Sequence, residues 1–89
     1  MVVEESVVIT NQVGLHARPA RLLVQTAAQF QSQIQLTCKE KTANAKSMIG
    51  VLRLGAVKGD TLQLRAEGDD AQNAIQTLTE LIQRKFDEE

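Results

Sequence analysis

Apolar and polar residues alternate along four separate stretches of this chain, which is the pattern of β-strands with one buried face. These stretches are Glu4–Asn11, Gln33–Cys38, the shorter Lys41–Ala45, and Leu62–Glu67. The connection Lys39-Glu40 lacks the glycine or Asn-Gly pair that two-residue hairpins favour. Because all four strands alternate, we expect an antiparallel sheet with one face against helices and the other in water.

Three further stretches space their apolar residues three and four positions apart, which predicts helices over Ala17–Gln29, Lys46–Leu54 and Ala71–Phe86. Ser47 is a good N-cap residue for the second helix, and Gly55 is typical of the position after a helix end. The buried face of the first helix should comprise Ala20, Leu23, Val24, Ala27 and Ala28. That of the last helix should comprise Ala74, Ile75, Leu78, Leu81, Ile82 and Phe86.

The order β-α-β-β-α-β-α indicates an α+β open-faced β-sandwich, in which a four-stranded antiparallel sheet carries three helices on one face. A chain of 89 residues has the size of one domain, so residues 1–89 are expected to form a single domain. Gly68-Asp69-Asp70 should end the fourth strand and cap the last helix together with Gln72 or Asn73. The acidic ending Asp87-Glu88-Glu89 should be a frayed, solvated tail.

Composition excludes several classes of function. A net charge of −1, no Trp or Tyr and only two Phe argue against direct nucleic-acid binding, which needs basic surface and stacking side chains. The single Cys38 excludes an internal disulfide and is expected to be a small core residue. One His and one Cys match no metal-ligand spacing, so neither a metal nor another cofactor is expected. Without a signal-peptide pattern or a long apolar run, the protein should be cytoplasmic, with no membrane insertion.

The only histidine, His16, lies in Gly14-Leu15-His16-Ala17-Arg18-Pro19-Ala20, directly before the first predicted helix. The first turn of a helix leaves backbone N–H groups unpaired and carries partial positive charge, so it attracts anions. Pro19 suits that turn because its missing N–H costs no helical bond, and Gly14 can take an unusual backbone angle before it. Arg18 adds a charged fork suited to phosphate. These features predict a phosphoryl group carried on His16; the alternative is an ordinary surface histidine.

Independent hydrolysis is not expected from this chain. The residues around His16 include no Ser, Asp or Glu that would complete a general-base arrangement, and a chain of this length builds no deep closed cavity. An imidazole can itself be a nucleophile. The sequence therefore favours a carrier without turnover of its own over an enzyme.

The second predicted helix has more apolar residues than one side of two helical turns can bury. Val51 and Leu54 are expected to face the core. The remaining apolar residues, expected to form an exposed patch that docks a partner, are Met48, Ile49 and Leu52. Burial of some or all of this patch is the alternative. Ser47 also has two interpretations: a helix N-cap only, or a phosphorylation site whose phosphate would meet free helix amides.

On these residues, the whole chain resembles the HPr family, the histidine-containing phosphocarriers of the sugar phosphotransferase system. The segment from Gly14 to Ala20 matches the active-site motif of that family. Lys46-Ser47-Met48-Ile49-Gly50-Val51 is similar to its regulatory-site motif, and Ala66-Glu67-Gly68 to the end of its last strand. Both motifs stand at the family's spacing within the same order of elements.

The resemblance implies that His16 accepts a phosphoryl group from enzyme I, which phosphoenolpyruvate charges, and passes it to enzyme II A-domains. It also implies that the phosphate rides on Nδ1, held by the helix-start amides at Ala17 and by Arg18. Ser47 matches the serine that an ATP-dependent kinase modifies in some members and a phosphorylase restores; the modified form is a corepressor for a transcriptional regulator. By the same resemblance the protein should be a monomer.

Other features leave alternatives open. Val13 stands where many family members have a polar residue that touches the phosphate, so one polar contact is expected to be missing. The segment Ile9–Gly14 and the ending Phe86–Glu89 resemble the nitrogen-related regulatory branch, whereas Lys46–Gly50 is similar to the kinase-regulated sugar branch. A rival of another class is a binding or corepressor module acting through Ser47, and the intact motif around His16 favours the carrier.

Overall fold

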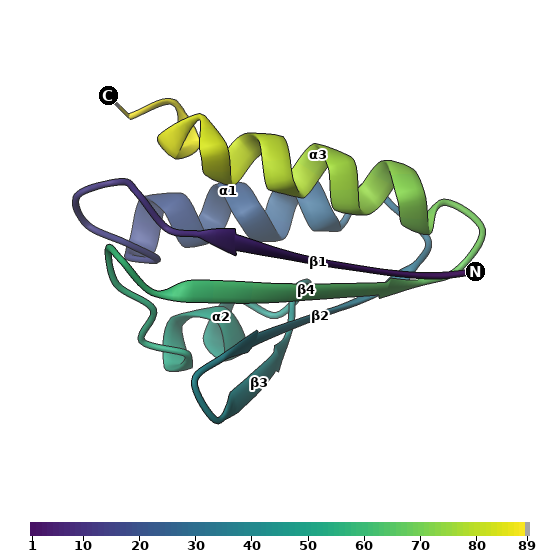
Figure 1. Cartoon of the computed structure of the whole chain (residues 1–89), viewed down its shortest axis with the longest axis horizontal. Helices are drawn as coiled ribbons and strands as arrows, with labels where there is room; N and C mark the ends of the chain where they lie inside the picture. Colours follow the sequence, from purple (N-terminus) through teal and green to yellow (C-terminus); the bar gives the residue numbers. More distant parts are fainter. Residues whose placement is uncertain (89) are drawn as a thin grey trace.

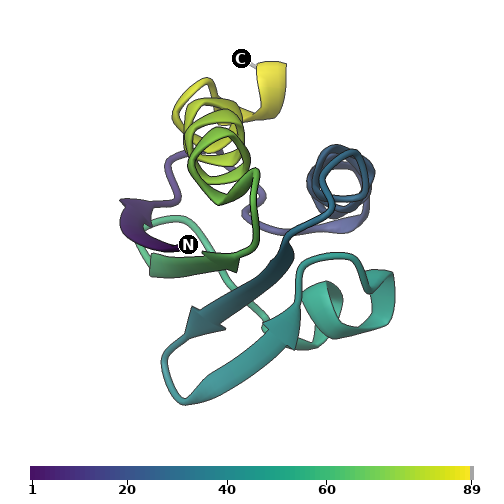
Figure 2. The ribbon, with the colours of Figure 1, turned by 90° about the vertical axis from the view of Figure 1, so that its right-hand side faces the viewer.

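A four-stranded antiparallel sheet forms one layer of the protein, and three α-helices pack on one face of it (Figures 1 and 2). This computed structural model describes residues 1–88. Along the chain the elements are β1 (Val2–Val8), α1 (Ala17–Ala27), β2 (Gln33–Cys38), β3 (Lys41–Asn44), α2 (Met48–Arg53), β4 (Thr61–Glu67), α3 (Ala71–Gln83) and a short 3₁₀ turn, η1 (Lys85–Asp87). The predicted α+β open-faced sandwich is confirmed.

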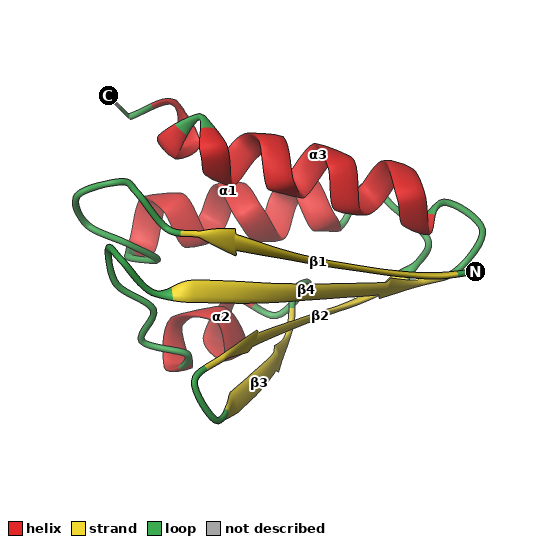
Figure 3. Ribbon diagram, in the orientation of Figure 1, coloured by secondary structure: helices red, strands yellow, loops and turns green. Residues whose placement is uncertain are grey.

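The strands lie in the order β1-β4-β2-β3, so β4 is in the interior of the sheet although it comes last in sequence. Leu64 of β4 stands opposite Glu5 of β1 on one side and Leu36 of β2 on the other. Alternate residues of β4 are buried against the helices, and those between them are exposed on the open face. Figure 3 distinguishes the strands from the helices by colour, and Figure 2 shows the three helices on the same side of the sheet. The alternation in the sequence therefore records the two faces of the sheet.

The first predicted strand was displaced by two to three residues. It covers Val2–Val8 rather than Glu4–Asn11, because β4 pairs with β1 along its whole length, from Val2 opposite Glu67 to Val8 opposite Thr61. Ile9 lies beyond the strand and donates its N–H to the carbonyl oxygen of Asp60. The chain from Ile9 onward is therefore free to form the loop that leads to α1.

The two long helices bury most of the residues that their spacing predicts, although Val24 of α1 is only half-buried. All six apolar residues expected on the last helix face are buried, whereas Ala28 after α1 is exposed. The helix α1 ends at Ala27 because the N–H groups of Gln29 and Phe30 bond to carbonyls only three residues back. Such bonds tighten the last turn of a helix and end it.

The hairpin between β2 and β3 forms without a glycine. Cys38 pairs with Lys41 across a two-residue turn, and Lys39 adopts a positive φ of 58° there. Cys38 is buried as expected. The left-handed backbone that glycine usually supplies is therefore taken by a lysine.

The carboxyl-terminal end corrects two predictions. The last helix stops at Gln83, and three consecutive residues with positive φ, from Lys85 to Asp87, turn the chain so that Phe86 still enters the core. Asp87 pairs with Arg84 at 3.1 Å, and Glu88 accepts a hydrogen bond from Asn11. The expected frayed tail is wrong for Asp87 and Glu88; Glu89 lies outside the described residues.

Asp70 occupies the N-cap position of α3, but its side chain caps another segment. Its carboxylate accepts hydrogen bonds from the Ser32 hydroxyl and from the backbone N–H groups of Gln31 and Ser32. The Ser32 hydroxyl, then these backbone donors, lower the pKa of Asp70 below its ordinary value. The predicted side-chain cap is therefore wrong, and Asp70 instead joins the start of α3 to the chain before β2.

Candidate functional site

His16 is the N-cap residue of α1, and its side chain is exposed. Its carbonyl oxygen accepts the first helical bond from Ala20, at 2.9 Å, and its imidazole makes no capping bond. Pro19 has no N–H, so the donors left in the first turn are the amides of Ala17 and Arg18. Neither amide has an acceptor within residues 1–88. The imidazole therefore stands beside two free donors and the positive end of a helix.

Gly14 makes this placement of His16 possible. Its φ is +64°, a region that side-chain-bearing residues rarely adopt. A Cβ on Gly14 would lie 2.5 Å from the carbonyl oxygen of Ala56 and 2.7 Å from the Cα of Val57. The backbone before His16 is therefore pressed directly against the loop that joins α2 to β4, residues 54–60, which we call the supporting loop.

Hydrogen bonds hold the segment before His16 on the supporting loop. Leu15, itself buried, donates its N–H to the carbonyl oxygen of Ala56 at 3.0 Å. At the other end of the segment, Ile9 donates to Asp60 at 2.9 Å and accepts from Gly59 at 2.8 Å. The position of His16 thus depends on a loop some forty residues further along the chain.

Asn11 is a fully buried polar residue within that segment, and the sequence analysis did not single it out. Its Nδ2 donates to the carbonyl oxygen of Gly14 at 2.9 Å and to Oε1 of Glu88 at 3.2 Å. Its backbone carbonyl oxygen accepts a hydrogen bond from the N–H of Gly14 at 3.3 Å. Asparagine commonly closes turns in this way, so its place three residues before Gly14 was the available signal.

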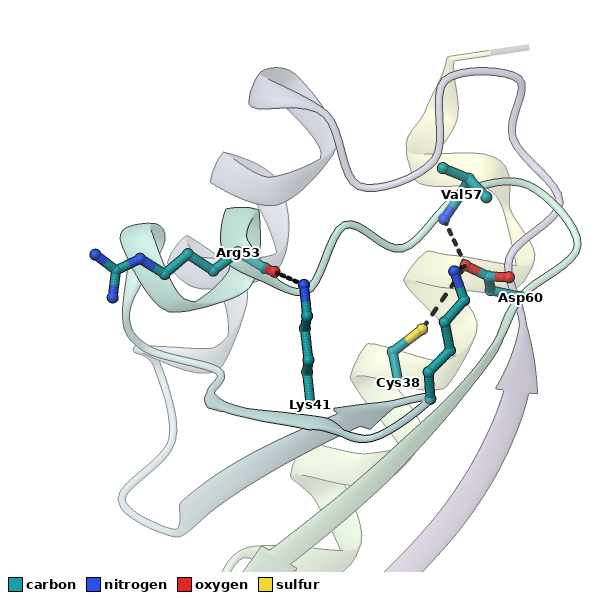
Figure 4. Close-up of polar contacts among 6 residues, drawn as sticks. Cys38, Lys41, Arg53, Val57 and Asp60 are labelled. Atoms are coloured by element: carbon teal, nitrogen blue, oxygen red, sulfur yellow. Dashed lines mark hydrogen bonds and ion pairs between the residues drawn. The ribbon is translucent and has the colours of Figure 1, made fainter.

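Asp60 is the second residue that the sequence analysis missed. Its Oδ2 accepts the N–H of Val57 at 2.9 Å, pairs with Nζ of Lys39 at 3.3 Å, and lies 3.8 Å from Sγ of Cys38 (Figure 4). The Val57 bond is the main cause that lowers the pKa of Asp60 below its ordinary value, and Lys39 adds to it. Burial, followed by the nearby Asp60 charge, raises the pKa of the Cys38 thiol. Cys38 is therefore a thiol in the core rather than a reactive thiolate.

The side chains of Ala17 and Arg18 are exposed, and Arg18 has no hydrogen bond or ion pair within residues 1–88. Between residues 6 and 59 the sequence has seven Lys or Arg and a single acid, Glu40. This segregation of charge was readable in the sequence, although the net charge of −1 conceals it. An anion at His16 would thus meet a guanidinium with no competing partner.

Ser47 is the N-cap residue of α2, as predicted. Its Oγ accepts the N–H of Gly50 at 3.1 Å, and its backbone is in the extended region. The preceding Lys46 reaches the carbonyl oxygen of Phe30, just after α1, at 2.6 Å. The two helices are therefore tied together, and α2 lies beside the first half of α1 (Figures 1 and 2).

The apolar residues of α2 divide as the spacing predicts, apart from Met48. Val51 and Leu54 are buried, whereas Ile49 is 65% exposed and Leu52 is 42% exposed. Met48 is half-buried and packs on the core, so only part of its side chain contributes to the exposed patch. In the loop before α1, the side chain of Val13 is 52% exposed. The predicted loss of a polar contact with the phosphate at this position stays a prediction.

The described residues include no group of three or more His, Cys, Asp or Glu placed to hold a metal ion. Among the helices within residues 1–88, none is long and apolar enough to cross a membrane.

In sequence and in fold, the chain matches the small histidine-containing phosphocarriers. The family model described as the PTS HPr component phosphorylation site matches residues 3–84. The chain therefore belongs to the HPr family of phosphotransferase-system phosphocarriers.

Individual relatives agree with this assignment. The phosphocarrier protein HPr of Xylella fastidiosa (strain 9a5c) is 42% identical over 86 residues, which is 97% of each chain. The crystal structure of HPr-C-His from Thermoanaerobacter tengcongensis is 49% identical, with a TM-score of 0.95 over 98% of both chains. A crystal structure of an HPr dimer from the same organism is 51% identical, with a TM-score of 0.77 over 88% of this chain and 90% of that chain. Membership implies partners of the phosphotransferase system such as enzyme I and the IIA proteins.

Proposed function

We propose that His16 is the residue that accepts the phosphoryl group from phosphorylated enzyme I and delivers it to enzyme II A-domains in sugar uptake. The observation that carries this proposal is the exposed imidazole of His16 at the start of α1, beside the free amides of Ala17 and Arg18. The guanidinium of Arg18, which has no partner within residues 1–88, is in the same turn. Together they offer an anion site at a nucleophilic nitrogen.

The proposed step transfers one phosphoryl group and no other atom. The lone pair of the unprotonated ring nitrogen, which we assign as Nδ1, attacks phosphorus while the bond from phosphorus to its donor breaks. The other nitrogen, Nε2, keeps the ring proton. The negative phosphate oxygens then face the amides of Ala17 and Arg18 and the Arg18 guanidinium.

The site is suited to a relay rather than to storage of the phosphate. Contacts with a helix dipole at an exposed position contribute about 0.3–1 kcal/mol each, which favours the phosphate without trapping it. No carboxylate occurs between Glu5 and Glu40 in the sequence, so the chain near His16 supplies no general base for hydrolysis. We therefore propose a phosphoryl carrier without turnover of its own.

Partner docking is assigned to the exposed patch of Ile49 and Leu52, with the exposed part of Met48. An apolar patch next to an open site lets a partner exclude water during transfer. The excess of Lys and Arg between residues 6 and 59 suits a partner with an acidic surface. Ile49→Asp should weaken the binding of enzyme I in a calorimetric titration, with Gln76→Asp on α3 as control. Equal affinities for the two variants would remove Ile49 from the docking surface.

Regulation is assigned to Ser47. Phosphorylation of its Oγ by a serine kinase, and removal by a phosphorylase, would place negative charge at the start of α2, next to the patch. The modified form would then suit a different partner, a transcriptional regulator. This assignment is supported by the position of Ser47: its Oγ accepts a hydrogen bond from the amide of Gly50, and the residue remains partly exposed.

We also propose that residues 1–89 act as one HPr-like domain, as a monomer in the cytoplasm. His16, Ser47 and the patch belong to one chain, so no second copy is needed to complete the site. Sedimentation at micromolar concentration should give one species of 9.8 kDa. A stable species of twice that mass would contradict the monomer, and recovery in a membrane or periplasmic fraction would contradict the location.

The experiment for the carrier function is labelling from phosphoenolpyruvate through enzyme I. Full-length protein should take up an acid-labile, base-stable label only when enzyme I and phosphoenolpyruvate are both present. It should then lose the label to an enzyme II A-domain. An acid-stable label, or none with an enzyme I that charges another carrier, would contradict the proposal.

A further inference from the structure

Asp60 joins two parts of the fold that are distant in sequence. Its carboxylate receives a backbone hydrogen bond from Val57 within the supporting loop. It also forms an ion pair with the Lys39 ammonium, in the β2–β3 turn, and accepts a hydrogen bond from the Cys38 thiol at the end of β2. Figure 4 shows Val57 and Cys38 converging on this carboxylate, the first from the loop and the second from the sheet. Asp60 therefore fixes the supporting loop both internally and against the sheet.

The supporting loop in turn carries the segment that ends at His16. The carbonyl oxygen of Ala56, the neighbour of Val57, accepts a hydrogen bond from the Leu15 N–H. Gly14 packs closely against the Cα of Val57. The backbone of Asp60 itself accepts from Ile9, where that segment begins. An unbroken series of contacts thus runs from the Asp60 carboxylate through Val57 and Ala56 to the residue before His16.

We infer that Asp60 is a positioning residue for phosphoryl transfer at His16, acting through the supporting loop rather than on the reacting atoms. The inference rests on the proposed role of His16. Transfer needs the nucleophile in line with the donor, and displacing it by about 1 Å can cost up to about a hundredfold in rate. Asp60 belongs neither to the exposed patch on α2 nor to the first turn of α1. Its loss should therefore slow the transfer step and leave the affinity for enzyme I unchanged.

The bonds at Asp60 are unequal, and this difference shapes the test. The Lys39 side chain is 64% exposed, so its ion pair contributes little. The Val57 N–H bond is internal to the loop and is the largest single cause that lowers the Asp60 pKa. Asp60→Ala removes every contact, whereas Asp60→Asn keeps one oxygen able to accept from Val57. Asp69→Asn, an exposed change before α3, is the matched control.

The experiment measures the maximal rate of transfer from phosphorylated enzyme I, the enzyme I concentration at half that rate, and the exchange of the Leu15 amide proton. Asp60→Ala should lower the maximal rate about tenfold with the half-saturating concentration within twofold, and should speed Leu15 exchange more than that of core amides. Asp60→Asn should fall between Asp60→Ala and the control.

Unchanged maximal rate and Leu15 exchange in Asp60→Ala would overturn the inference, as would a change confined to the half-saturating concentration. If Asp60→Ala fails to fold, the maximal rate and the Leu15 exchange are measured in Asp60→Asn instead. The inference is overturned if both equal those of Asp69→Asn. If the unmodified protein takes no label from enzyme I, the proposed function of His16 fails. The Leu15 exchange still shows separately whether Asp60 holds the loop.

Discussion

The backbone N–H of Leu15 donates to the carbonyl oxygen of Ala56 at 3.0 Å, one residue before the exposed imidazole of His16. This bond joins the end of the β1–α1 loop to the supporting loop. Gly14 lies against the same carbonyl group. One peptide unit therefore both bonds to the backbone before His16 and leaves no room for a side chain at Gly14. The site is thus exposed at its imidazole and rigidly supported beneath it.

Gly14→Ala should destabilise the fold more than Gly55→Ala. The two glycines have nearly equal φ, +64° and +61°, so each alanine should cost about 1–2 kcal/mol for left-handed backbone. Only at Gly14 would the added Cβ also meet Ala56 and Val57, whereas no atom of residues 1–88 lies within 4 Å of a Cβ placed on Gly55. The added overpacking should raise the loss at Gly14 to roughly 3 kcal/mol in urea unfolding. Equal losses would show that the close approach is relieved at no cost.

Arg18→Ala should keep the fold and slow transfer from enzyme I. Arg18 is exposed and has no partner within residues 1–88, so no interaction among these residues depends on its charge. Losing a charge-assisted contact of about 1.5–3 kcal/mol with the phosphoryl group corresponds to a slowing of about ten- to a hundredfold. Arg21→Ala, one turn further along α1, is the control. Quenched-flow rates within twofold of the unmodified protein would remove Arg18 from the site.

Ser47→Ala should lower the free energy of unfolding by about 1 kcal/mol and leave transfer working, because only the cap to Gly50 is lost. Ser47→Asp can still cap the helix but places a negative charge beside the patch. We expect it to slow phosphorylation of His16, and less than a phosphoserine with its charge of about −2. Rates for Ser47→Asp and the serine-phosphorylated protein that both match the unmodified protein would leave Ser47 as a cap only.

Asp70 should make stability depend on pH in the acid range. Its pKa is lowered in the folded protein from the ordinary value of 3.8, chiefly by the Ser32 hydroxyl. The stabilisation is therefore complete above that ordinary value and is lost as the pH falls through the lower folded pKa. Asp70→Asn should have a lower melting temperature at pH 7, and the difference should shrink below about pH 4. A constant difference from pH 7 to pH 2 would contradict this.

The elements were predictable because their signals are local. Alternation located the buried residues of β2 and β4, and the three- and four-residue spacing on α2 separated Val51 and Leu54 from Ile49 and Leu52. Ser47 and its bond to Gly50 lie within one turn, so the cap was equally readable.

Apart from the end of α1, the residues that were misassigned or missed have partners far away in sequence. Asp70 is a residue type that favours helix caps, but its carboxylate bonds to Gln31 and Ser32 and makes no capping bond to α3. Asn11 bonds to Glu88, 77 residues away, after the chain turns through the positive φ of Phe86. The role of Asp60 depends on the β2–β3 turn being beside the supporting loop. The spacing of apolar residues along the chain does not predict such long-range contacts between polar side chains.

Phosphorylation of the unmodified protein and of His16→Ala, with enzyme I and labelled phosphoenolpyruvate, tests the central claim most directly. His16 is the only imidazole in the chain and is exposed, so its replacement should leave the circular dichroism spectrum and thermal unfolding unchanged. The account predicts about one acid-labile phosphoryl group per unmodified chain and none on His16→Ala. Undiminished acid-labile label on the folded His16→Ala protein would contradict it.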